Sequence, residues 1–176
     1  MSHDNALRIY LNDHLAGSTT GVELARRIAH AHSASADAAR LQRLAEDIAQ
    51  DRRTLLELMA RLDVQPHKYK IVGGWAAEKV SRLKPNGRAY RRSRLSPLIE
   101  LETLRIGIQG KQRLWHALMP VASQTDRLDS QLIAALATRA AEQAAVVDEL
   151  HERAAAAALS PPAREAGAPG GEGAQP

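Results

Sequence analysis

Four titratable residues lie on or beside helical stripes that are otherwise apolar, and together they predict one polar layer. His14 and Asp51 belong to two predicted helices that are joined by a turn near residue 33. If the two helices run antiparallel from that turn, residues whose numbers add up to about 65 lie opposite each other, as His14 and Asp51 do. A similar turn about residue 122 sets Arg105 opposite Arg139. We therefore expect these four side chains to share the middle of a helical bundle.

Such a layer suggests chemistry of two kinds. A histidine beside a carboxylate can serve as a general base, and the group can also form a small anion or metal pocket. Two arginines near one aspartate repel a cation, and no nucleophile or substrate pocket is indicated nearby. The structural interpretation is a salt-bridge network that fixes helix register, since a buried charge is costly unless it is paired. We favour that interpretation and predict no catalytic residue and no metal ligand.

The stretch from residue 68 to residue 94 concentrates the positive charge of the chain. It contains nine Lys or Arg and one acid, Glu78, whereas all other positions together carry fifteen basic and nineteen acidic residues. With Trp75 and Tyr90 interleaved, such a stretch can contact phosphates and stack on bases, and its binding would depend on salt. The predicted docking residues for an anionic partner are Lys79, Arg82, Lys84, Arg88, Arg91, Arg92 and Arg94.

The partner of this basic stretch is left open by the residues alone. No recognised nucleic-acid-binding motif accompanies it, so an anionic protein and a nucleic acid are both considered. A lipid surface is less favoured, because the apolar face of the stretch is modest. The simplest alternative is that the stretch packs its apolar residues on the bundle while its arginines pair with acids such as Glu57, Glu100 and Glu102, or stay in water.

Length and composition restrict the class of protein. A chain of 176 residues fits one domain with a sizeable core. The absence of Cys excludes disulfides and thiolate chemistry and favours the cytoplasm. The amino terminus lacks the pattern of a signal peptide, and no stretch approaches the ~20 apolar residues of a transmembrane segment. Abundant Leu and Ala, with no Phe, indicate an all-α fold.

Apolar spacing predicts four long helices that position these residues. The first covers about residues 5–29, the second follows a cap at Ser35 or Asp37 and ends before Pro66, the third begins near Ser96 and Pro97, and the fourth follows a cap at Ser123 or Thr125 and ends near Leu159. The helical domain spans residues 1–159 and includes a short helix within the basic stretch. Residues 160–176, rich in Pro, Gly and Ala, are predicted to be a disordered tail. The expected architecture is an antiparallel four-helix bundle with a long crossover between the second and third long helices.

This layout, with the segment YLNDHLAGSTTGVELARR in the first predicted helix, resembles the ferritin-like family. Members of that family bind two irons with a Glu from each of two helices and Glu-x-x-His from each of the other two. The chain contains no Glu-x-x-His, so those ligands cannot be carried over and no cofactor is predicted. Small residues Gly17, Ser18 and Gly21 are expected to allow close helix approach, with a ligand niche as the alternative.

Two functions from different classes follow. The preferred interpretation is a non-catalytic helical-bundle interaction protein that docks through the basic crossover. The alternative is a divergent ferritin-like metal-binding or redox protein. The Ala-rich end of the last predicted helix also suits a homo-oligomer contact.

Overall fold

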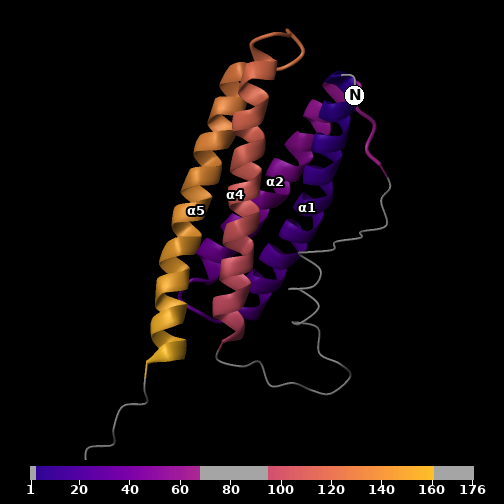
Figure 1. The fold of residues 1–176 in the computed structure, drawn as a ribbon. Coiled ribbons are helices and arrows are strands. Elements are labelled where there is room, and N and C mark those ends of the chain that lie inside the picture. Colours follow the sequence, from indigo (N-terminus) through magenta and orange to yellow (C-terminus); the bar gives the residue numbers. More distant parts are fainter. Residues whose placement is uncertain (1–2, 68–94, 161–176) are drawn as a thin grey trace, which may run out of the picture.

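The computed structural model describes residues 3–67 and 95–160, and within these ranges the chain is helical and contains no strand. The four helices are α1 (His3–Ala31), α2 (Ala38–Arg61), α4 (Ser96–Ala122) and α5 (Ser130–Leu159) (Figure 1). The all-α prediction is therefore confirmed. The predicted short helix in the basic stretch and the predicted disordered tail lie outside the described residues, apart from Ser160 at the start of the tail.

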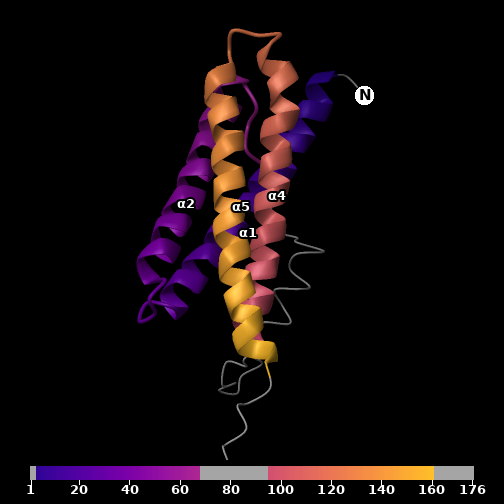
Figure 2. The same cartoon turned by 90° about the vertical axis from the view of Figure 1, so that its left-hand side faces the viewer.

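The helices pack as two pairs that lie side by side. Helix α1 runs along α2, α4 runs along α5, and α1 also contacts α4. Two views at right angles show that the four helices extend along one long axis (Figures 1 and 2). An ion pair across the bundle links Arg153 of α5 to Asp37, directly before α2, with 2.7 Å between Nη2 and Oδ1. Near the other end of α5, Arg127 Nη1 lies 2.6 Å from Asp63 Oδ2.

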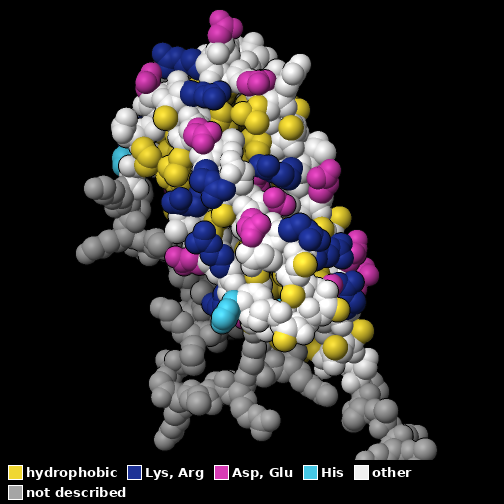
Figure 3. Space-filling view, turned by 180° about the vertical axis from the view of Figure 1, so that it is seen from behind, with side chains coloured by type: hydrophobic (Ala, Val, Ile, Leu, Met, Phe, Trp, Pro, Cys, Tyr) yellow, Lys and Arg dark blue, Asp and Glu magenta, His cyan; other side chains and the backbone are white. Residues whose placement is uncertain are grey.

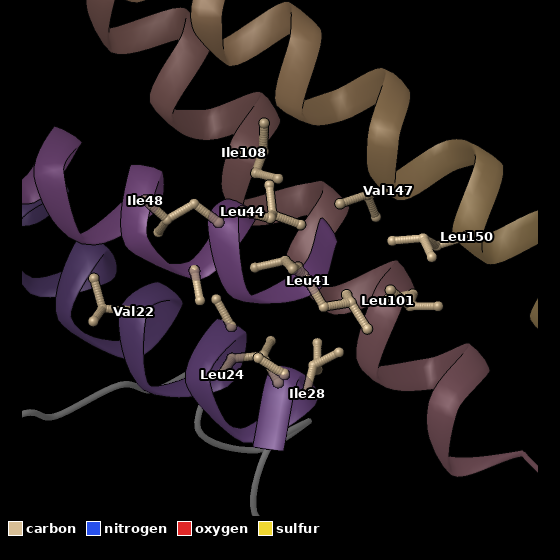
Figure 4. Packing of buried hydrophobic residues seen from close by; sticks show 14 of the residues in the cluster. Val22, Leu24, Ile28, Leu41, Leu44, Ile48, Leu101, Ile108, Val147 and Leu150 are labelled. Atoms are coloured by element: carbon tan, nitrogen blue, oxygen red, sulfur yellow. The ribbon is translucent and has the colours of Figure 1, made fainter. Parts of the chain in front are cut away.

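The apolar core is divided into two clusters along this axis. One contains side chains from all four helices, and Figure 4 shows Ile28, Leu44, Ile108 and Val147 of this cluster pointing toward one another. The other lies toward the opposite end and is centred on fully buried side chains such as Trp115. Between the two clusters lies a level with few large apolar side chains, and the candidate site occupies it.

Two helix starts differ from the predicted ones. Helix α5 is capped by Asp129 instead of Ser123 or Thr125, because the Asp129 carboxylate accepts hydrogen bonds from the backbone N–H groups of residues 131 and 132 at 2.8 and 3.2 Å. Ser96, predicted as a cap, is already the first residue of α4. Helix α2 begins after Asp37, one of its two predicted caps, although the Asp37 side chain makes no capping hydrogen bond.

Candidate functional site

Asp51 of α2 is the centre of a buried charge cluster at the level between the two core clusters. Its side chain is 1% exposed, and three donors from the other helix pair surround it. Lys111 Nζ of α4 donates to Oδ2 at 2.5 Å, Gln143 Nε2 of α5 donates to Oδ2 at 3.0 Å, and Arg139 Nη2 of α5 donates to Oδ1. Lys111 Nζ also donates to Gln143 Oε1. We call Asp51, Lys111, Arg139 and Gln143 the charge centre.

Helical periodicity explains why these polar side chains point inward. Lys111 stands three residues after Ile108 and four before Trp115, both of which are buried. Gln143 has the same relation to Ala140 and Val147 on α5. Each polar residue therefore occupies a place on the apolar stripe that a hydrophobic side chain would otherwise fill.

Burial sets the electrostatics of the charge centre. One carboxylate faces two cations. The cost of removing these three charges from water is offset only if every charged group makes good hydrogen bonds. Burial lowers the pKa of Lys111 below its usual 10.5, and the neighbouring Asp51 carboxylate opposes that shift. Arg139 bonds Asp51 through Nη2, while its buried Nε has no hydrogen-bond partner.

The structure brings together two of the four residues predicted for the polar layer. Asp51 and Arg139 meet, although the register argument had set Asp51 opposite His14 and Arg139 opposite Arg105. Arg105 does not join them, because it lies on the outer side of the helix and its Nε donates to Asp148 Oδ1 at 2.7 Å in a largely exposed pair. The sequence argument also did not identify Lys111 and Gln143. The pattern that could have revealed them is that each is a polar residue at a position of its helix's apolar stripe.

His14, the fourth predicted member, borders the same region without bonding the carboxylate. It is half-buried, and its ring meets Tyr10 edge-on with 4.6 Å between ring centroids. Within the described part of the chain, no hydrogen bond or ion pair joins His14 to Asp51. Burial lowers the pKa of His14 below 6.5, and the nearby Asp13 carboxylate opposes this shift.

A cavity of about 240 Å³ adjoins the charge centre between α1, α2 and α4. Asp51 and Lys111 form part of its wall, and most of the remaining surface is apolar. Gly17 and Gly21 of α1 also line it, and a Cβ added to either would meet no atom within 4 Å. The expectation that these small residues allow close helix approach is therefore wrong, since they border open space.

A second polar cluster holds Gln65 and His67, just before the basic stretch, against α1. Asn12, 4% exposed, accepts a hydrogen bond from the His67 backbone N–H at 2.6 Å and donates to the carbonyl oxygens of Arg8 and Gln65 at 2.9 and 3.3 Å. Sequence reasoning gave no role to Asn12, although it too lies beside an apolar stripe position, Leu11.

The seven predicted docking residues, Lys79, Arg82, Lys84, Arg88, Arg91, Arg92 and Arg94, lie outside the described residues. In the parts that are described, no three His, Asp or Glu side chains gather in a way that could hold a metal ion. No helix in the same ranges has the length and apolarity needed to cross a membrane.

Comparisons with protein-family models, curated proteins and solved structures gave no match for this chain. The class that the described residues define is a helical bundle with a buried charge centre. The resemblance to the ferritin-like family stays an expectation drawn from the sequence.

Proposed function

We propose that this chain is a non-catalytic helical-bundle interaction protein, antiparallel and ferritin-like in layout, whose basic stretch 68–94 docks an anionic protein or nucleic acid. The closed charge centre is the observation that carries the non-catalytic part. Asp51 already accepts hydrogen bonds from Lys111, Arg139 and Gln143, so it is not free to act as a general base. The bonds of these groups to one another suit a structural network.

The distribution of charge supports docking through the basic stretch. The stretch carries +8, from nine basic residues and one acid, while the rest of the chain carries −4, from fifteen and nineteen. On the described face seen in Figure 3, basic and acidic side chains alternate, so neither sign dominates there. A net positive stretch on a net acidic scaffold favours an anionic partner. Asn12 accepts a hydrogen bond from the backbone N–H of His67, the residue directly before the stretch.

Replacing Arg88, Arg91 and Arg92 with Gln tests this proposal. We expect affinity for single-stranded RNA to fall, and the slope of log affinity against log salt concentration to decrease by up to about 2, since each phosphate contact on a single strand contributes about 0.7. The measurement is fluorescence anisotropy over a salt series, repeated with DNA, an acidic protein and anionic vesicles to identify the class of partner.

The matched control removes three exposed helical arginines, Arg26, Arg61 and Arg113, by the same substitution. This variant has the same net charge as the first and should keep the larger part of the affinity. Equal binding by wild type and both variants would show that the basic stretch is ordinary surface charge. Circular dichroism checks that all three proteins are folded.

The alternative, a divergent ferritin-like metal-binding or redox protein, finds no support from residues 3–67 and 95–160, where no three metal-binding side chains gather. Metal analysis of protein purified without a histidine tag distinguishes the two functions. Stoichiometric iron or manganese would favour the alternative over the interaction protein. The cytoplasmic location and a homo-oligomer also remain proposals.

A further inference from the structure

All four glycines of the described helices border one cavity. Gly17 and Gly21 belong to α1, Gly107 and Gly110 belong to α4, and all of them line the space of about 240 Å³ beside the charge centre. Glycine weakens a helix interior relative to alanine, so its presence there calls for a physical reason. Close packing is not that reason, because a Cβ added at any of the four would meet no atom within 4 Å. The feature that these four glycines share is that their missing side chains leave the cavity open.

Unused hydrogen-bond donors border the same cavity. An ammonium has three donors, and Lys111 uses two of them on Asp51 and Gln143. Arg52 is half-buried, donates from Nε to Thr19 Oγ1 at 3.2 Å, and has no acidic partner in the described ranges. Lys111 and Arg52 thus retain N–H groups that the protein itself leaves open, and both residues line the cavity.

The rest of the cavity wall is chiefly apolar, and the volume of the cavity is modest. Leu24, Ile48, Leu104 and Ile108 contribute to it from three helices. A buried apolar cavity of about 150 Å³ already binds benzene, while sites for drug-sized ligands begin near 300 Å³. A volume of about 240 Å³ therefore suits a molecule of a few more atoms than benzene.

We propose that this cavity binds a small monocarboxylic acid, with its apolar body among the aliphatic side chains and its carboxylate on Lys111 and Arg52. A carboxylate accepts hydrogen bonds from both cations, whereas an amine would add a third positive charge beside them. Two carboxylates also border the cavity: Asp51 is already bonded to Lys111, Arg139 and Gln143, and Asp13 is exposed, so water screens its charge. This site is separate from the proposed docking function and uses no residue of the basic stretch.

Hexanoate, hexanol and hexylamine test the proposal, because they share an apolar body and differ in the head group. Binding is followed by the fluorescence of Trp115 in a Trp75→Phe background, which leaves one indole in the chain. We expect hexanoate to bind at least roughly tenfold more tightly than hexanol, since a charged hydrogen bond adds about that factor, and hexylamine to bind most weakly. Arg52→Gln should lower the affinity for hexanoate toward that for hexanol and leave hexanol binding unchanged.

Filling the cavity provides the second test. Gly110→Leu places a side chain in the open space, and we expect it to reduce hexanoate affinity by at least roughly tenfold, as a blocked site requires. The matched control is Ala117→Leu, at an exposed position of the same helix that does not line the cavity. If Gly110→Leu does not fold, Gly21→Leu fills the same space from α1. Equal affinity for the three head groups, or unchanged hexanoate binding in the folded filled variant, would overturn the proposal.

Discussion

The solvent exposure of each ion pair determines how much that pair contributes to the stability of the fold. Arg105 and Asp148 form a short contact, but both side chains are substantially exposed, so water screens their attraction and the pair stabilises the fold by at most about 1 kcal/mol. Asp51 is 1% exposed, and removing it would leave the largely buried Lys111 and the half-buried Arg139 without a counter-charge. The same pair of charges therefore has a far larger effect at the centre of the bundle than on its surface.

His14 should make stability depend on pH near neutrality. Its pKa is lowered from 6.5 in the folded state, so the unfolded chain binds more protons in the window just below 6.5. Stability should consequently fall as the pH drops from above 6.5 through the lowered folded pKa. We expect His14→Gln to reduce this fall, because glutamine does not titrate.

The measurement is the free energy of unfolding in urea at about pH 7.5 and about pH 5.5, on either side of the histidine window. The difference between the two pH values should be smaller in His14→Gln than in wild type. Identical pH dependences in the two proteins would mean that burial of His14 has no effect on its titration.

At the scale of the helix, the cap of α5 is the clearest local determinant. The Asp129 carboxylate satisfies two backbone N–H groups at the start of the helix that have no partner within it. Asp129→Ala should lower the free energy of unfolding by about 1 kcal/mol. Ser130→Ala, one residue further on, is the matched control and should change it little. If Ser130→Ala lowered the free energy of unfolding as much as Asp129→Ala does, Asp129 would not be the cap of α5.

Periodicity in the sequence was enough to predict the four described helices, because each has a continuous apolar face. The end of α5 near Leu159 was predicted closely, while its start was not, because several residues in 123–129 can cap a helix equally well on paper. The two short turns predicted that His14 would face Asp51 and Arg105 would face Arg139, but Asp51 binds Arg139 instead and Arg105 binds Asp148. Asp51 and Arg139 belong to α2 and α5, which no turn connects, so the register of the turns could not set their contact. Lys111 was not predicted, because lysine in a helix is usually exposed and its position on an apolar stripe does not by itself show that it is buried.

The cavity could not be predicted from the sequence. Glycines on two helices allow either close approach or open space, and the choice depends on how far apart the surrounding side chains hold the helices. Here α1 and α4 leave space at Gly17, Gly21, Gly107 and Gly110. That separation is a property of the assembled bundle, which the pattern of one helix does not contain.

For the whole molecule, the charge centre lies between the two apolar clusters of the core. Asp51 comes from the α1/α2 pair, and its three partners come from the α4/α5 pair. One carboxylate thus ties the two halves of the bundle together at a fixed level. A shift of either pair by one helical turn would separate buried charges, so the network favours one register over others.

The central claim is that the charge centre acts as one structural unit, and a double-mutant cycle on Asp51 and Lys111 tests it most directly. Urea unfolding of Asp51→Ala should show a loss of about 3–5 kcal/mol, because the largely buried Lys111 and the half-buried Arg139 lose their partner. Adding Lys111→Met removes one of those cations, so the double variant should lose less than the sum of the single variants, by at least about 1 kcal/mol. Additive losses, or a loss of at most about 1 kcal/mol for Asp51→Ala alone, would contradict the account.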